Sequence, residues 1–292
     1  MTVVQAGGLG KAAGQLGISQ PAVSKSLAAL ENTLGVRLLE RSRQGTTPTP
    51  YAVALIKRSA AIFDELRQGF QDIEFLADPS VGEVRIGATE PLSVAVIAPA
   101  INQLYRKLPR IRFRVTVGDQ AALFRGLLDR HFEVVLGTIA PVPDQFDVDT
   151  LFEDTLVVAT GAENPLARRR KLALSDLLNE PWATFPFDSR FGSLVENVFL
   201  VRGLNPPEPT VTSLSPYLLN ELRVTGHFVS IVPGFSLELP HKHRAITALP
   251  ISLAETRMPV GIVTLKNRML SPRVKLFLDQ VRLVVKPLAK PK

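Results

Sequence analysis

A single glycine, Gly17, divides a stretch of helical apolar spacing near the start of the chain. The periodic positions are Ala12, Ala13 and Leu16 before the glycine, and Val23, Leu27, Leu30 and Leu34 after it. Apolar residues three and four positions apart predict two helices, and the glycine predicts a tight turn between them. Ser19 can cap the second helix, and Pro21 fits its first turn, where a missing N–H costs little.

The second predicted helix has two different faces. We expect its apolar face, which contains Val23, Leu27, Leu30 and Leu34, to pack against neighbouring helices. The opposite face has small or hydrogen-bonding side chains, which suit entry into a DNA major groove: Gln20, Pro21, Ser24, Lys25 and Ala28. This pattern is typical of a DNA recognition helix and not of a catalytic surface.

Two further segments follow this pair of helices. Residues 36–43 and 44–48 predict short extended segments around a glycine-centred turn, which would form a small wing. Residues 51–76 contain neither Gly nor Pro apart from Gly69 and predict a long helix. Its seam steps by four and three residues, at Leu55, Ser59, Ile62, Leu66, Gly69, Ile73 and Leu76. The seam fits either packing on its own domain or a dimer coiled coil, and we favour the dimer.

These motifs together resemble the signature of the LysR-type transcription regulators. That signature has an A-A-x-x-L helix, an S-Q-P-A-V-S recognition start, an L-E-x-x-L-G-x-x-L-F-x-R stretch and a wing that ends in T-P. Here the elements stand at Ala12, Ala13 and Leu16, at residues 19–24, at residues 30–41, and at Thr49 with Pro50. Leu39 replaces the usual Phe, and Tyr51 stands where Gly is common.

The resemblance implies a set of DNA contacts. Gln20, Pro21, Ser24 and Lys25 would approach bases, Lys11 and Arg41 would hold phosphates, and Arg43 would enter the minor groove. Ser19 and Thr46 complete the expected DNA-binding set. The expected dimerisation residues are Leu55, Ile62, Leu66 and Ile73. A homodimer or homotetramer would then bind a palindromic operator and act on RNA polymerase.

The start of the chain departs from the family pattern. The family begins with an additional apolar helix before the point that matches Met1, and here residues 2–6 alone correspond to it. Either the start is assigned too late or this variant lacks that helix. If it is absent, we expect incomplete burial of Val23 and Leu27, and weaker operator binding and a lower melting temperature than in an upstream-extended chain.

After Ser80 the sequence changes to strand-like segments that alternate with helical ones. The first block is residues 84–89, 94–108, 112–117, 121–130, 134–138 and 156–160, and the second is 182–185, 195–201, 216–224, 228–232 and 260–265. Such alternation predicts a mostly parallel, helix-covered sheet. Because the pattern occurs twice, we expect two similar lobes.

The resemblance implies the following architecture for the whole chain. The fold class is α+β multidomain, with an all-α winged helix-turn-helix at residues 1–50, a linker and dimerisation helix at 51–78, and an effector-binding domain at 82–292. That domain would be α/β, two-lobed and similar to the type II periplasmic binding proteins. Lobe I would hold about residues 82–159 and 266–292, and lobe II about 160–265, with crossings near Thr160 and Leu265.

A small-molecule effector would lie between the lobes, at the carboxyl ends of strands. The residues expected there are Thr89, Ser93, Asp119, Thr138, Phe187 and Ser215. Ser and Thr at such points also serve as plain helix caps. Glu90 and Asp119 would place negative charge beside the cleft, which favours a sugar, lactone or other polyhydroxylated ligand over an anion.

Composition limits the other function classes. The net charge of +7 comes from residues 266–292, which hold eight Lys or Arg against Asp279, so charge alone does not predict DNA binding. The chain has no Cys, which excludes disulfides and thiolate metal sites, and no long apolar span or export signal. We therefore expect a bacterial cytoplasmic regulator that is not an enzyme, with no cofactor and no metal.

Two alternatives come from other classes of protein. Gly8, Gly10 and Ala13 with Glu31 imitate a dinucleotide-binding pattern, but a helix is predicted where its second strand should lie. A solute-binding protein would share the two-lobed fold, and it would require export. His131, His227, His241 and His243 form no helical ligand pair, and we expect them on the surface.

Overall fold

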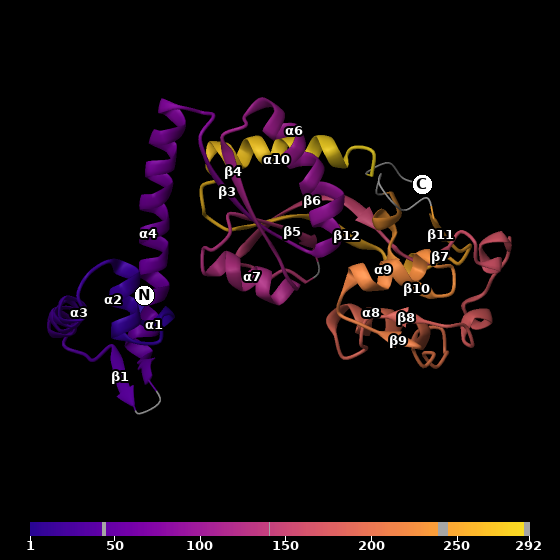
Figure 1. Ribbon diagram of the computed structural model, residues 1–292, viewed down its shortest axis with the longest axis horizontal. Coiled ribbons are helices and arrows are strands. Elements are labelled where there is room, and N and C mark those ends of the chain that lie inside the picture. The colour runs from indigo at the N-terminus through magenta and orange to yellow at the C-terminus, as the bar shows by residue number, and fades with distance from the viewer. Residues whose placement is uncertain (43–44, 140, 239–244, 289–292) are drawn as a thin grey trace. The chain divides into compact units, whose positions relative to one another are not determined.

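A computed structural model describes residues 1–42, 45–139, 141–238 and 245–288 of the protein. The chain divides into two compact units, Met1–Gln71 and Asp72–Lys292 (Figure 1). No helix within the described ranges combines the length and the hydropathy that a bilayer-spanning helix needs.

The first unit is a winged helix-turn-helix. Its elements are α1 (Thr2–Gln5), α2 (Leu9–Leu16), α3 (Gln20–Leu34), β1 (Leu39–Ser42), β2 (Gly45–Pro48) and the first part of α4 (Pro50–Ala77). Gly17 adopts a left-handed φ of 66° in the turn between α2 and α3. The Ser19 hydroxyl accepts a hydrogen bond from the N–H of Ala22 at 3.4 Å, and Pro21 lies in the first turn. The predicted turn and cap are confirmed.

The core of this unit is small and corrects two expectations. Leu9, Ala13 and Val23 are buried together, and Val3 and Leu27 pack against them. Val23 is 5% exposed although α1 has four residues, so its expected incomplete burial is wrong, whereas Leu27 is half-buried. Leu30 and Leu34, which we expected on the packed face of α3, are 43% and 44% exposed. The described core of this unit includes Val23 and Leu27 from α3 and does not include these two leucines.

A carboxylate ties the wing to α3. The Glu31 Oε1 atom accepts hydrogen bonds from the N–H groups of Leu38 at 2.7 Å and Leu39 at 3.2 Å. Strands β1 and β2 pair antiparallel in the register Leu39 to Pro48. The wing therefore has a fixed position relative to the recognition helix.

Lobe I of the second unit is a five-stranded sheet covered on both faces. Its strands are β3 (Gly82–Ala88), β4 (Ile111–Val117), β5 (Val134–Thr138), β6 (Phe146–Asp154) and β12 (Met258–Leu265), in the order β4-β3-β5-β12-β6. Helices α6 (Ala98–Lys107) and α10 (Pro272–Val285) cover one face, and α7 (Gln120–Leu128) covers the other (Figure 1). The short helix α5 (Glu90–Leu92) and a π-helical turn (Ser93–Ile97) precede α6.

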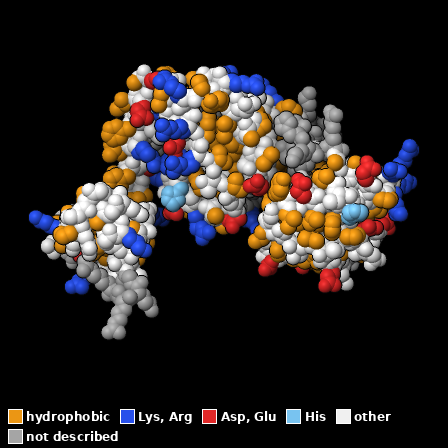
Figure 2. Space-filling model, viewed as in Figure 1, with side chains coloured by type: hydrophobic (Ala, Val, Ile, Leu, Met, Phe, Trp, Pro, Cys, Tyr) orange, Lys and Arg blue, Asp and Glu red, His pale blue; other side chains and the backbone are white. Residues whose placement is uncertain are grey.

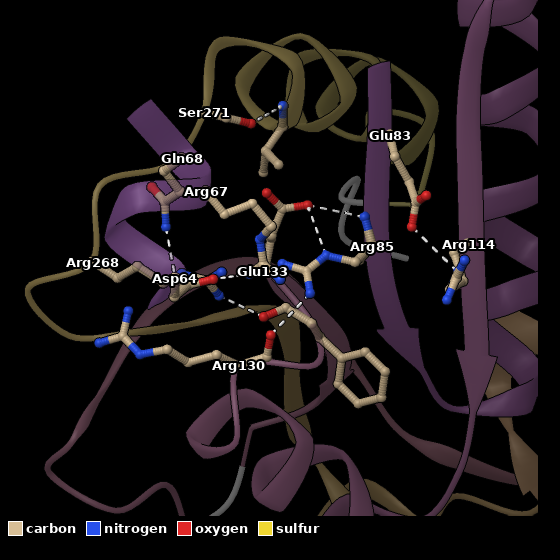
Figure 3. Close-up of polar contacts among 12 residues, drawn as sticks. Asp64, Arg67, Gln68, Glu83, Arg85, Arg114, Arg130, Glu133, Arg268 and Ser271 are labelled. Atoms are coloured by element: carbon tan, nitrogen blue, oxygen red, sulfur yellow. Dashed lines mark hydrogen bonds and ion pairs between the residues drawn. The ribbon is translucent and has the colours of Figure 1, made fainter. Parts of the chain in front are cut away.

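Polar contacts fix strand β3 of lobe I. The Glu133 carboxylate accepts a hydrogen bond from the N–H of Arg85 at 3.0 Å, and the Arg85 Nη1 atom donates to the Arg130 carbonyl at 3.0 Å (Figure 3). Glu83 of β3 pairs with Arg114 of β4 at 3.2 Å. Because β3 and β5 are held in register, their carboxyl ends, at Thr89 and Thr138, open on the same edge.

Lobe II is built around a smaller sheet in the order β10-β7-β11. Its strands are β7 (Leu156–Gly161), β10 (Val229–Pro233) and β11 (Ile246–Ala248), with the short parallel pair β8 (Ala183–Thr184) and β9 (Val211–Thr212). Its helices are α8 (Arg190–Leu200) and α9 (Pro216–Val224). Trp182 is fully buried in the lobe core, where its indole N–H donates to the Leu177 carbonyl at 2.8 Å.

The strand pairing corrects two expectations. The chain passes between the sheets at Thr155 and again between Ala248 and Met258, not near Thr160 and Leu265. One residue, Thr155, separates β6 from β7, so no loop marks the point where the chain leaves the first sheet. The sheets are also less parallel than expected: β12 is antiparallel to both neighbours, and β7 is antiparallel to β10 and β11.

The contact between Glu31 and the wing predicts a stability effect confined to the first unit. We expect Glu31→Ala to cost about 1–2 kcal/mol, because two half-buried N–H groups lose their acceptor. That loss lowers the melting temperature of a unit of this size by about 5 °C or more, measured by far-ultraviolet circular dichroism. Fluorescence of Trp182, which lies in the second unit, should not change its midpoint. The control is Glu40→Ala, an exposed carboxylate of the same wing; an equal shift in both variants contradicts the assignment.

Candidate DNA-binding face and effector cleft

One face of α3 presents polar side chains to solvent. Gln20, Pro21, Lys25 and Ala28 are exposed and Ser24 is half-buried. Val23, on the opposite face, is 5% exposed and packs against Leu9 and Ala13. Residues three and four positions apart lie on the same side of a helix. The structure therefore brings the predicted base-contacting residues together on a free surface.

The other residues of the predicted DNA-binding set lie around α3. Lys11 is exposed on α2, and the hydroxyl of the exposed Ser19 is occupied as the cap of α3. The backbone of Arg41 lies opposite that of Thr46 where β1 pairs with β2. Thr46 is half-buried. Arg43 lies outside the described residues.

Helix α4 carries the predicted dimerisation seam. Ile62, Leu66 and Ile73 are 66%, 56% and 65% exposed, and Leu55 is half-buried. Phe63 and Phe70, beside the seam, are also exposed. A row of large apolar side chains that remains accessible to water is unusual for a single chain in solution.

A large cavity lies between the two lobes of the second unit. Its volume is about 1770 Å³, and the residues that line it come from the ends of β3, β4 and β5 in lobe I and from α8, α9 and β10 in lobe II. The walls are mainly apolar. Figure 2 shows hydrophobic side chains gathered over α8 and α9. The exposed apolar residues that line the cavity from lobe II include Leu194, Val201, Leu214 and Tyr217.

The structure brings three of the six predicted effector residues to this cavity. Thr89, Asp119 and Thr138 line it. Ser93, Phe187 and Ser215 are not among the described residues that do so. The Ser93 hydroxyl donates to the Glu90 carbonyl at 2.7 Å. The Ser215 hydroxyl caps α9 by accepting from the N–H of Leu218 at 3.2 Å, and Phe187 packs against the core of lobe II.

Sequence reasoning missed a charged residue in this cavity. Arg223 of α9 lines the cavity and is 8% exposed. The available signal was its spacing: it follows Leu219, which is 2% exposed, by four residues and therefore lies on the buried face of its helix. Burial lowers the pKa of Arg223 to about 10, which leaves it protonated at neutral pH.

The alternative motifs find no support in the geometry. Gly8 precedes helix α2, and Glu31 lies within α3 with its carboxylate occupied by the wing. His131 and His227 are exposed, whereas His241 and His243 lie outside the described residues. Among the described residues, no group of three His, Asp or Glu side chains could hold a metal ion.

Comparison with known proteins covers nearly the whole chain. Residues 1–53 match the family model described as bacterial regulatory helix-turn-helix protein, lysR family. Residues 77–285 match the model described as LysR substrate binding domain. The HTH-type transcriptional regulator GbpR of Azospirillum brasilense is 28% identical over 277 residues, which cover 94% of this chain and 81% of the relative. YdcI of Escherichia coli (strain K12), an uncharacterized HTH-type transcriptional regulator, is 24% identical and covers 97% of this chain and 92% of its own length.

Solved structures share the complete architecture. A full-length OxyR variant from Pseudomonas aeruginosa matches with a TM-score of 0.69 at 20% identity, over 97% of this chain and 94% of that one. Full-length CbnR, solved in complex with its target DNA, matches with a TM-score of 0.56 at 22% identity, over 98% and 96%. The expected fold, a winged helix-turn-helix joined to a two-lobed effector-binding domain, is confirmed. The chain belongs to the LysR family of DNA-binding transcription regulators.

Proposed function

We propose that this regulator binds a palindromic operator as a homodimer and that a small molecule in the cleft between its lobes controls its activity. The observation that carries the proposal is the polar face of α3, which is free opposite the buried Val23. Gln20, Ser24 and Lys25 would contact base edges, and Pro21 would contact a thymine methyl group. Lys11, Ser19, Arg41 and Thr46 would hold the backbone, and Arg43 would enter the minor groove.

The dimer supplies the symmetry that a palindrome requires. The apolar residues of α4 would be covered by α4 of a second copy, through Leu55, Ile62, Leu66 and Ile73. A two-fold axis between the helices would place two recognition helices on two half-sites. Pairing of dimers into a tetramer and contact with RNA polymerase belong to the same proposal.

A ligand in the cleft would control the activity of the regulator. A ligand that binds one arrangement of the two lobes better than another shifts the population toward it. Thr89, Asp119 and Thr138 line the cavity and would contact that ligand. The family consists of transcription regulators, and we assign this chain no catalytic activity.

The two classes of DNA contact predict different effects. We expect Gln20→Ala to weaken binding of the selected operator by about 1–3 kcal/mol, or about 5- to 150-fold, because a bidentate base contact is lost. We expect Lys11→Ala to weaken binding to every sequence alike and to reduce the salt slope of binding by about one. Fluorescence anisotropy measures both, on a duplex selected by the unaltered protein from a random library.

The matched control for these variants is Lys107→Ala, which removes an exposed positive charge from the second unit. Its operator affinity should match that of the unaltered protein. A Gln20→Ala variant that binds and discriminates as the unaltered protein does contradicts the assignment of α3.

The seam on α4 predicts the oligomeric state. We expect the double variant Ile62→Glu, Leu66→Glu to raise the dimer dissociation constant at least about 100-fold, because four carboxylates would be buried in an apolar interface. Sedimentation equilibrium measures this constant. Lys57→Glu changes an exposed residue on the other side of the helix and should leave the dimer intact. If the double variant dimerises as strongly as the unaltered protein, the dimer interface does not include Ile62 and Leu66.

A further inference from the structure

The cavity between the lobes holds a buried positive charge that lacks an acidic partner. The Arg223 Nε atom is shielded from water and has no hydrogen-bond partner among the described residues. The Nη2 atom donates to the Oδ1 atom of Asn220 at 3.2 Å, and Asn220 is neutral. Burial lowers the pKa of Arg223 to about 10, and none of the ion pairs among the described residues includes Arg223.

The backbone holds Arg223 in this buried position. Helix α9 packs against β7 at Gly161, where a Cβ atom would lie 2.6 Å from the Arg223 carbonyl oxygen. That close approach requires glycine at position 161 and holds the backbone of Arg223 against the sheet. The residue is 8% exposed, whereas arginines on a protein surface extend their charged end into solvent.

The carboxylates of the cavity do not neutralise this charge. Asp119 is exposed and caps α7 by accepting from the N–H of Ala122 at 2.7 Å. Asp154 accepts from the N–H of Phe235 at 3.0 Å. Glu90 is half-buried in lobe I, Glu221 is exposed, and Glu255 pairs with Arg202. Two other cations that line the cavity, Arg190 and Arg257, are exposed. Water screens the exposed charges of the cavity, but it screens a buried charge much less. Because a buried charge is stable only with a partner of opposite sign, Arg223 determines which ligand charge the cavity favours.

Lobe I offers a second donor without a partner. Gln120, the first residue of α7, lines the cavity and is 9% exposed. Its Nε2 atom has no hydrogen-bond partner among the described residues. Buried donors in native proteins nearly always have an acceptor. A ligand that brings acceptors to both lobes would satisfy Gln120 and Arg223 together.

We propose that the effector is a small organic oxyanion whose negatively charged group, a carboxylate or a phosphate ester, binds Arg223 in lobe II while a second acceptor binds Gln120 in lobe I. This inference rests on the proposed role of the cleft as the effector site. It replaces the expectation of a sugar, lactone or other polyhydroxylated ligand. That expectation was based on the charges of Glu90 and Asp119, but Asp119 is exposed to water and Glu90 is half-buried. Two oxygen atoms of a carboxylate or of a phosphate match the fork of N–H donors on a guanidinium group, which accounts for an arginine at this position.

A thermal-shift experiment on the full chain tests the proposal. The probes are inorganic phosphate and the matched pair gluconate and glucose. In each titration sodium chloride is adjusted so that the ionic strength stays constant. The variants are Arg223→Met, Arg223→Lys and Gln120→Leu, with Arg170→Met as the control because Arg170 is exposed in lobe II and does not line the cavity. General stabilisation by salts affects all variants equally, so the saturable difference reports the site.

We expect phosphate and gluconate to raise the melting temperature of the unaltered protein and of Arg170→Met in a saturable way. The apparent dissociation constant should rise at least about tenfold in Arg223→Met and less in Arg223→Lys. Without any probe, Arg223→Met should melt at least about 2 °C higher than the unaltered protein, because a buried cation without a partner is removed. If Arg223 only stabilised the fold, Arg223→Met would instead melt at a lower temperature than the unaltered protein.

Three results would overturn the inference: equal responses to the anions in the unaltered protein and Arg223→Met, no saturable response to either anion, or a saturable response to glucose alone. The last would leave the cleft as an effector site for a neutral ligand. The proposed regulator function fails separately, if the full chain selects no duplex from the library.

Discussion

The packing of Val23 against Leu9 and Ala13 fixes the rotation of α3, and the DNA-binding function depends on that rotation. Successive residues of a helix differ by about 100° around its axis. Lys25 lies about 200° around the axis from Val23, so burial of Val23 turns Lys25 to solvent. Ser24 lies about 100° away and is half-buried, and Gln20, in the first turn, is exposed. The cap at Ser19 sets where the helix begins, and the Glu31 carboxylate sets where the wing lies relative to it. Three local interactions thus determine which side chains a duplex could meet.

In the effector domain the central feature is a set of buried donors whose hydrogen bonds are not all made. The cores of both lobes are apolar, but Arg223 and Gln120 line the cavity with donors that have no hydrogen-bond partner among the described residues. A buried cation without a counter-ion reduces the stability of the domain without ligand. An anion that supplies the missing contacts would stabilise the arrangement that it binds, and this difference in affinity is what a control switch requires.

The sequence predicted the DNA-binding unit well because its signals are local. A glycine in a left-handed turn, a serine cap and an early proline act within a few residues, and each appears in the structure where it was expected. The exposure of Leu30 and Leu34 was not predictable, because apolar spacing indicates a face that could be buried and not what covers it. The crossings between lobes were misplaced because β6 and β7 are separated by Thr155 alone. Arg223 was missed because its burial depends on which face of α9 other parts of the lobe cover, and α9 packs against β7, which is distant in sequence.

Directed cleavage of DNA from α3 tests the central claim most directly. The chain has no Cys, so Lys25→Cys provides a single attachment point for an iron chelate that cleaves nearby DNA. The account predicts cleavage of the selected operator at two positions, related by the dyad and about one helical turn apart. The same chelate at Leu218→Cys, an exposed position in the second unit, should give no such symmetric pair. Absence of cleavage from position 25, in a protein that binds the operator normally, would contradict the assignment of α3 as the recognition helix.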